Sequence, residues 1–242
     1  MMNKKLLTAA VAATLMSGAG YSQAEDEFAI SGNVALTSDY RFRGISQSDE
    51  SAAIQGGFDA VFAPGFYIGT WGSSVDFDNN EDYDGSLELD YYGGWRSAIG
   101  DTDFGVDVGY IYYDYPGDNG ADGDYQEVKV AGTWKTLSVS VNYSDDYYAG
   151  TDEFWYLAAD YSHAFTDSLT LGLHVGYNIL EEGEGFLSSD EDNYTDYSVK
   201  LTYTVATVGL SVAWVDTTLD EDDVFGTEWG EGAAVFTISK SM

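Results

Sequence analysis

The sequence predicts an all-β protein: a single transmembrane antiparallel β-barrel of about twelve strands, with short periplasmic turns and long acidic extracellular loops. Three observations favour this fold. Apolar and polar residues alternate along segments of roughly ten to twelve residues, the length that a tilted strand needs to cross a membrane. The connections between these segments alternate strictly between short and long. The chain has 20 Tyr, 12 Phe and 6 Trp against 2 Pro, and aromatic residues gather at the two interfaces of membrane barrels.

The first predicted strand spans residues 28–43 and shows the alternation clearly. Its even positions are mostly apolar or aromatic, from Phe28 to Phe42, whereas its odd positions are small, polar or charged. Successive side chains of a strand point to opposite faces, so one face is apolar and the other polar. A soluble β-sandwich also alternates, but its strands average about five or six residues.

Eleven more segments follow with the same pattern. The second, 52–63, meets the third, 66–77, at the Pro64-Gly65 turn, and the third is expected to face outward with Tyr67, Trp71, Val75 and Phe77. The others are 87–96, 104–112, 127–135, 137–144, 155–161, 169–179, 197–203, 208–214 and 236–242. An even number of strands places both ends of the barrel on the side of the short turns, which is the periplasmic side in an outer-membrane barrel.

The N-terminal segment predicts export. Two lysines precede an apolar run from Leu6 to Gly20, and Ser22-Gln23-Ala24 supplies the small residues of a cleavage site. We therefore expect residues 1–24 to be a signal peptide, cleaved before Glu25, and residues 25–242 to form one barrel domain in the outer membrane of a Gram-negative bacterium. The chain has no Cys, which excludes disulfides, zinc–thiolate sites and thiol nucleophiles.

The charges within the predicted strands fall mostly on the face opposite the apolar one. They cannot lie unpaired in an apolar interior, and a barrel of about twelve strands is wider than its own side chains fill. The pattern therefore predicts a narrow hydrated lumen that contains some ion pairs. The predicted pore-lining residues are Asp39, Arg41, Arg43, Asp59, Glu88, Asp90, Arg96, Asp107, Glu127, Lys129, Asp160, His174 and Lys200, with Asp196 on the same face.

Two of the three arginines, Arg41 and Arg43, lie two residues apart at the loop end of the first strand. Positive groups here either contact an anionic solute or hold a loop in place. The net charge of −33 instead favours cations, because acidic rings raise their local concentration. The acidic stretch 78–84 is similar to a calcium loop only superficially, since Tyr83 replaces the required glycine, and it is expected to be a solvated loop.

The mature chain resembles a known family, most specifically in its first fifty residues. Residues 37–47, Thr-Ser-Asp-Tyr-Arg-Phe-Arg-Gly-Ile-Ser-Gln, are similar to the opening motif of the TorF family of porins. The segments 57–59 and 65–73 resemble its next hairpin, and 236–240 is similar to its closing strand. The resemblance implies an outer-membrane β-barrel of modest size and does not imply a solute.

These observations predict a porin-like channel for passive diffusion of small hydrophilic solutes or ions. The alternative is a non-conducting outer-membrane barrel whose acidic loops bind a partner or cations at the cell surface. An enzyme is not expected, because Ser162 and His163 are adjacent and point to opposite faces of a strand. We expect no cofactor, metal or nucleic acid; the expected partners are outer-membrane lipid and lipopolysaccharide, and homo-oligomer formation stays open.

Overall fold

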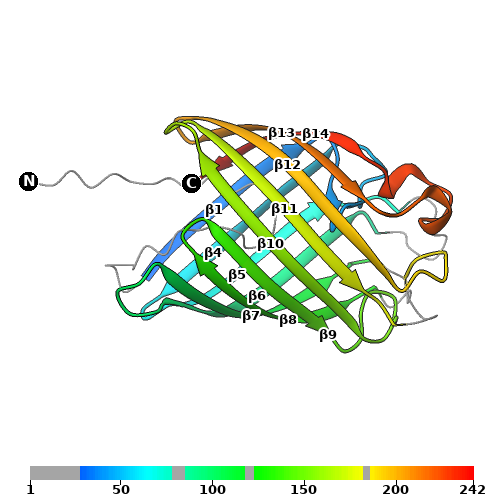
Figure 1. Cartoon of the computed structure of the whole chain (residues 1–242), viewed down its shortest axis with the longest axis horizontal. Coiled ribbons are helices and arrows are strands. Elements are labelled where there is room, and N and C mark those ends of the chain that lie inside the picture. Colours follow the sequence, from blue (N-terminus) through cyan, green and yellow to red (C-terminus); the bar gives the residue numbers. More distant parts are fainter. Residues whose placement is uncertain (1–27, 78–84, 118–122, 182–185) are drawn as a thin grey trace, which may run out of the picture.

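The computed structural model describes residues 28–77, 85–117, 123–181 and 186–242. Within them, twelve antiparallel strands form a closed barrel in which neighbours in sequence are neighbours in space and β1 pairs with β14 (Figure 1). The predicted fold class and strand number are confirmed. The barrel strands are β1 (Phe28–Thr37), β4 (Ala53–Phe62), β5 (Phe66–Ser74), β6 (Leu87–Ala98), β7 (Phe104–Asp114), β8 (Tyr125–Trp134), β9 (Leu137–Ser144), β10 (Phe154–Ala164), β11 (Leu169–Ile179), β12 (Asn193–Val205), β13 (Val208–Thr217) and β14 (Ala233–Ser241).

The two ends of the barrel differ in their connections. Short turns lie at one end, together with the first described residue and the C-terminus, and the long loops lie at the other (Figure 1). The loop end also carries a small hairpin, β2 (Arg41–Phe42) with β3 (Ile45–Ser46), and two 3-10 turns, η1 (Glu221–Asp223) and η2 (Glu228–Gly230). The predicted signal peptide and the acidic stretch 78–84 lie outside the described residues.

The strand lengths fit a bilayer. A ten-residue strand such as β1 rises about 33 Å along its own axis, and a tilt of about 40° reduces this to ~25 Å, the height of the apolar band of a membrane barrel. None of the described residues belongs to a helix long and apolar enough to cross a membrane.

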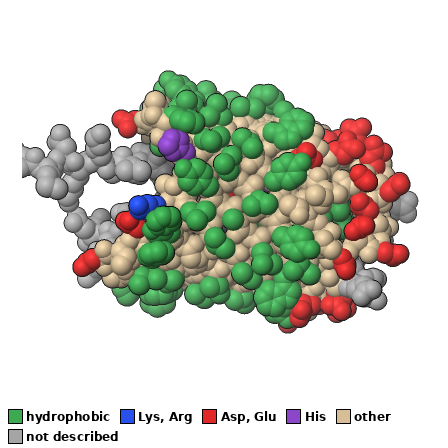
Figure 2. Space-filling model, in the orientation of Figure 1, with side chains coloured by type: hydrophobic (Ala, Val, Ile, Leu, Met, Phe, Trp, Pro, Cys, Tyr) green, Lys and Arg blue, Asp and Glu red, His purple; other side chains and the backbone are tan. Residues whose placement is uncertain are grey.

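The outer face is apolar and exposed. Ile30, Phe58, Val130 and Phe236 are 67%, 64%, 54% and 60% exposed. Other hydrophobic residues that point outward are also exposed on every strand of the wall. Figure 2 shows hydrophobic side chains over the barrel wall and acidic side chains gathered at the loop end. An apolar surface of this extent is far larger than the patches of soluble monomers, and a lipid environment accounts for it.

One predicted face is wrong. Strand β5 points Phe66 and Ile68 outward, at 54% and 58% exposure, whereas Tyr67 is buried and its hydroxyl donates to Asp107 inside the barrel. Trp71 also points inward, where its ring packs against Tyr40. Aromatic residues occupy both faces of this strand, so the alternation of residue types did not identify the outer one.

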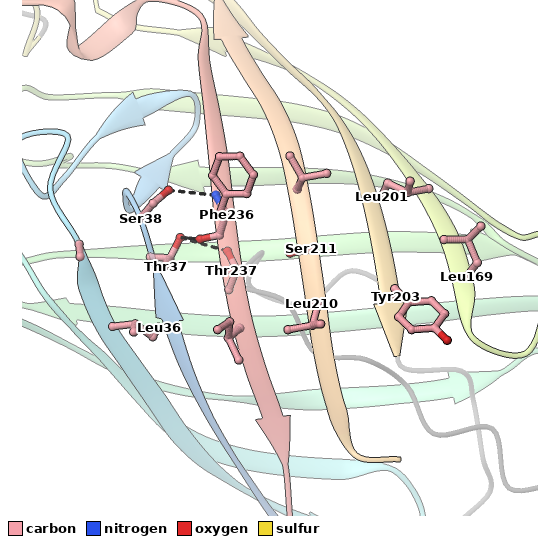
Figure 3. Close-up of a pocket in the computed structure, with 13 residues that line it drawn as sticks. Leu36, Thr37, Ser38, Leu169, Leu201, Tyr203, Leu210, Ser211, Phe236 and Thr237 are labelled. Carbon is pink, nitrogen blue, oxygen red and sulfur yellow. Dashed lines mark hydrogen bonds between the residues drawn. The ribbon is translucent and has the colours of Figure 1, made fainter. Parts of the chain in front are cut away.

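A groove of about 580 Å³ lies on the outer wall at the seam where β1 meets β14 (Figure 3). Leu36, Leu210 and Ile238 are among its lining residues. At its edge, the Thr37 and Thr237 hydroxyls lie 3.0 Å apart, and the Phe236 backbone N–H donates to Ser38 at 2.9 Å. The first contact joins the last paired residues and the second extends the seam by one residue, so both help to close the barrel.

Candidate functional site in the barrel lumen

The first loop folds into the barrel. The predicted first strand ends at Thr37 rather than at residue 43, so Asp39, Arg41 and Arg43 belong to a separate segment, residues 38–52, which we call the inner segment. Its β2–β3 hairpin turns at Arg43 and Gly44, whose φ angles are 49° and 85°. Two consecutive positive φ values define the type I′ turn that two-residue hairpins favour, and glycine adopts one of them without steric cost.

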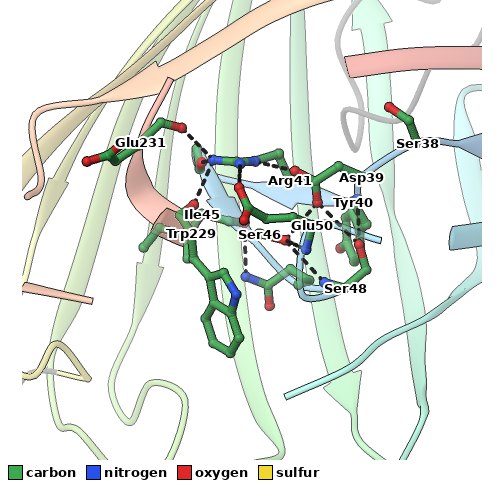
Figure 4. A network of polar contacts seen from close by, with 12 residues as sticks. Ser38, Asp39, Tyr40, Arg41, Ile45, Ser46, Ser48, Glu50, Trp229 and Glu231 are labelled. Atoms are coloured by element: carbon green, nitrogen blue, oxygen red, sulfur yellow. Dashed lines mark hydrogen bonds and ion pairs between the residues drawn. The ribbon is translucent and has the colours of Figure 1, made fainter. Parts of the chain in front are cut away.

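Arg41 attaches the inner segment to the last loop (Figure 4). Its guanidinium pairs with Asp39 at 2.5 Å and Glu50 at 3.2 Å, and it donates to the carbonyl oxygens of Trp229 at 2.7 Å and Glu231 at 2.8 Å. Arg41 is therefore occupied by groups of this chain, and its position serves to hold a loop.

Asp39 and Trp229 complete this network. Asp39 Oδ1 accepts hydrogen bonds from Ser46 at 2.7 Å and Ser48 at 3.2 Å, which fixes the hairpin against the end of β1. The indole N–H of Trp229 donates to Asp49 at 2.9 Å, so the last loop also holds the inner segment from its other side.

Arg43 crosses to the opposite wall and pairs with Glu127 of β8. Its Nη2 donates to both Glu127 oxygens, at 2.6 and 2.8 Å, and the two side chains are 5% and 0% exposed. The guanidinium also lies 4.3 Å from the Tyr156 ring centroid and 4.8 Å from that of Phe154, within cation–π distance. A buried bidentate pair of this kind fixes geometry strongly.

Tyr147, in the loop after β9, completes the surroundings of Arg43. Its hydroxyl accepts from Arg43 Nη1 at 3.2 Å. Burial raises the pKa of Tyr147 to about 12, against the opposing effect of the Arg43 charge. The hydroxyl is therefore neutral at physiological pH, and Glu127 carries the negative charge that balances Arg43.

A second group of charges lies on the inner face of β10, β11 and β12, beside Tyr156. His174 lies between two carboxylates, with Nδ1 at 2.8 Å from Asp160 and Nε2 at 2.9 Å from Asp196. Lys129 is buried and Lys200 half-buried on the same inner face. Asp160, Lys200 and His174 retain partial exposure, so solvent reaches these side chains.

The other predicted pore-lining residues also point inward, and most contact aromatic groups. Asp59 accepts from the Tyr92 hydroxyl at 2.7 Å, Asp107 accepts from Tyr67 at 2.8 Å, and Arg96 lies 5.4 Å from the Tyr67 ring centroid. Glu88 and Asp90 are buried on β6 near the loop end. The predicted residues thus share the interior but form separate clusters along it.

The loop-side half of the lumen is packed, which the sequence did not indicate. Aromatic side chains from the strands and loops form one buried cluster with the inner segment; it includes Tyr40, Tyr113, Tyr125, Tyr147, Phe154, Tyr156, Tyr194 and Trp229. Adjacent aromatic pairs such as Tyr112-Tyr113 and Trp155-Tyr156 were the available signal, because neighbouring residues on a strand necessarily face opposite sides.

A cavity of about 320 Å³ remains at the loop end of this cluster. Its lining is mainly aromatic and includes Phe42, Tyr125, Tyr194, Phe225 and Trp229, with the polar Ser46 and Gln47. The described residues contain no group of three or more His, Cys, Asp or Glu side chains arranged to hold a metal ion. The side-chain partners of His174 are Asp160, Asp196 and Tyr156, so it has no serine partner among the described residues.

The comparisons with known proteins agree with the barrel. A family model described as "Bacterial protein of unknown function (Gcw_chp)" matches residues 21–242. The fold is similar to that of the KdgM porin, with a TM-score of 0.55 at 11% identity over 87% of this chain and 97% of that one. It is equally similar to the NanC porin, with a TM-score of 0.55 at 10% identity over 87% and 98%. No curated protein matches the chain in sequence.

Proposed function

Since the chain belongs to the Gcw_chp family, whose description assigns no function, we propose one from the lumen. The protein is an outer-membrane channel for passive diffusion of small hydrophilic solutes or ions, and the inner segment is its constriction. Its partners are outer-membrane lipid and lipopolysaccharide. The TorF resemblance and the predicted signal peptide support export to the outer membrane of a Gram-negative bacterium.

The inner segment is the observation that carries this proposal. A wall of twelve strands encloses more space than its own side chains fill, and here a separate piece of chain occupies the loop-side half. Polar contacts of Arg41 and Arg43 hold it there. A constriction attached by side-chain contacts can move while the wall stays closed. In a purely structural barrel, hydrophobic packing in place of the buried ion pairs would give the same stability, so the ion pairs would bring no advantage.

The charge distribution favours cations and neutral solutes. Arg41 and Arg43 are already neutralised by Asp39, Glu50 and Glu127, so they leave little positive charge for an anion. A KdgM porin structure of the same fold, with a TM-score of 0.52 at 10% identity over 88% of this chain and 96% of that one, is described as a complex with disordered oligogalacturonate. An anionic ligand of that kind does not fit this lumen, because its loop-end arginines are already paired.

Single-channel recording in a planar bilayer tests the proposal. The wild-type protein is expected to give discrete conductance steps. Arg41→Gln releases the inner segment from the last loop, so its steps become larger or more frequent. Lys135→Gln is the control, because Lys135 lies in a short turn with its side chain 59% exposed, and its conductance should match the wild type.

The second candidate is a non-conducting barrel whose acidic loops bind a partner or cations at the cell surface. The burial of Arg43 and Glu127 within the aromatic cluster favours it, because close packing at this level narrows the lumen. Absence of steps in several salts and voltages, for the wild type and Arg41→Gln alike, would establish this candidate and reject the channel.

A further inference from the structure

Two carboxylates on the inner face of β6 have no basic partner. Glu88 and Asp90 are 1% and 0% exposed, and no ion pair in the described part of the chain includes either of them. The Tyr40 hydroxyl donates to Glu88 Oε1 at 2.9 Å. Glu88 Oε2 and both carboxylate oxygens of Asp90 have no hydrogen-bond partner among the described residues, and the same is true of Gln55 Oε1.

These oxygens belong to one patch of the wall. Glu88 and Asp90 are two residues apart on β6 and so share its inner face. In the strand register, Gln55 of β4 lies opposite Ser73 of β5, and Ser73 lies opposite Glu88. The neighbours of Asp90 across the strands are Trp71 and Tyr113, and neither can supply a positive charge.

The other inward acids of the lumen differ in this respect. Glu127 pairs with Arg43, Asp160 and Asp196 contact His174, and Asp59 and Asp107 each accept a hydrogen bond from a tyrosine. Asp90 is the inward acid with no donor at all among the described residues. Burying two negative charges without compensation is too costly for a stable fold, so either a proton or a bound cation must neutralise the pair.

We propose that Glu88 and Asp90, with the Gln55 carboxamide oxygen from the same inner face of the wall, bind a hard divalent cation. Carboxylate and carboxamide oxygens are the ligands that Ca²⁺ and Mg²⁺ prefer, and a charge of +2 balances two carboxylates. The acidic loops above the site raise the local concentration of cations. The ion joins the wall at β4 and β6 to Tyr40 of the inner segment, so it also stabilises the constriction.

Thermal unfolding of the full chain, purified in detergent, tests this site with Ca²⁺ as the probe. The protein is unfolded, then refolded either with Ca²⁺ or with EDTA, so that a buried site is open to the ion during folding. At Ca²⁺ a hundredfold above its Kd, we expect the unfolding temperature to rise by about 5 °C or more over the EDTA sample. Asp90→Asn and Glu88→Gln should each lose this shift.

Two further measurements separate loss of the ion from loss of stability: the behaviour of the amide variants in EDTA and a control variant at an exposed acid. The amide variants remove an uncompensated charge without changing shape, so in EDTA they should unfold at a higher temperature than the wild type. Asp103→Asn removes the same charge at a turn, where the side chain is 65% exposed, and should keep the full Ca²⁺ shift.

A wild-type protein that unfolds at the same temperature in Ca²⁺, Mg²⁺ and EDTA would overturn the proposal, since a proton then neutralises the pair. A Ca²⁺ shift that survives in Asp90→Asn would also overturn it by placing the ion elsewhere. If one variant fails to refold, metal analysis of the wild-type protein decides, with one bound divalent ion per chain expected. None of these outcomes depends on whether the barrel conducts.

Discussion

At the residue scale, Arg43 and Glu127 connect the inner segment to the wall through one buried ion pair. Removing one partner leaves the other charged and desolvated. Arg43→Met is therefore expected to lower the free energy of unfolding by about 3–5 kcal/mol. Urea unfolding in phospholipid vesicles, followed by tryptophan fluorescence, measures this loss.

The double variant Arg43→Met/Glu127→Gln separates pairing from packing. It removes both charges, while the amide that replaces the Glu127 carboxylate keeps the shape of the side chain beside Asn142. The double variant should therefore cost clearly less than the sum of the two single variants. Additive losses would show that the pair contributes nothing beyond its separate contacts. Lys135→Met, at an exposed pair 3.9 Å from Asp103, should change stability by less than about 1 kcal/mol.

At the element scale, the wall strands could be predicted because each depends on its own alternation and on the turn beside it. The inner segment could not. Its alternation continues through Tyr40 and Phe42, so it looks like more of β1. The contacts that bend it inward come from residues 84 and 188 positions away, Glu127 and Trp229, and no local pattern contains them.

The same limit applies to the candidate site. The inner face of most strands was identified correctly, because charged side chains avoid lipid. Which charges meet inside was not predictable, since His174 and Asp196 are brought together by the register of β11 and β12. The packing of the loop-side half follows from where the loops fold, which alternation does not encode.

Gly44 tests how the inner segment docks on the wall. Its φ is +85°, and a Cβ there would clash with Thr217 Cγ2 and lie 3.0 Å from Asp196 Cβ. Gly44→Ala should therefore displace the hairpin and expose Arg41 and Arg43 to trypsin, which should leave them uncut in the wild type. Gly100→Ala is the matched control: φ is +57° and nothing lies within 4 Å, so its digestion pattern should stay that of the wild type. Equal resistance of both variants would contradict this docking.

The outer face of each strand makes a separate prediction. Val130 lies midway along β8, points outward and is 54% exposed. Val130→Arg places a charge at the middle of the apolar band and should cost about 2–4 kcal/mol in vesicle unfolding, whereas Gln126→Arg, on the same face near the loop end, should cost about 0–1 kcal/mol. Equal costs at the two positions would show that lipid does not contact this face.

At the scale of the whole molecule, the charges are separated along the barrel axis. The chain carries a net charge of −33, and Figure 2 shows its acidic side chains concentrated at the loop end. Such a field attracts cations to one mouth of the lumen without any specific contact. Selectivity that comes from this field must depend strongly on ionic strength, whereas selectivity from a buried binding site depends on it much less.

We therefore expect the reversal potential across a salt gradient to show a preference for cations that weakens as salt increases. Between 0.01 M and 1 M, the distance over which a charge acts falls from about 30 Å to about 3 Å, so the loop acids stop reaching the mouth. Neutralising Glu221, Asp222 and Asp223 of η1 should reduce the preference at low salt and change little at high salt. A preference that is constant across this range, or one for anions, would place selectivity on charges inside the lumen instead of on the loops.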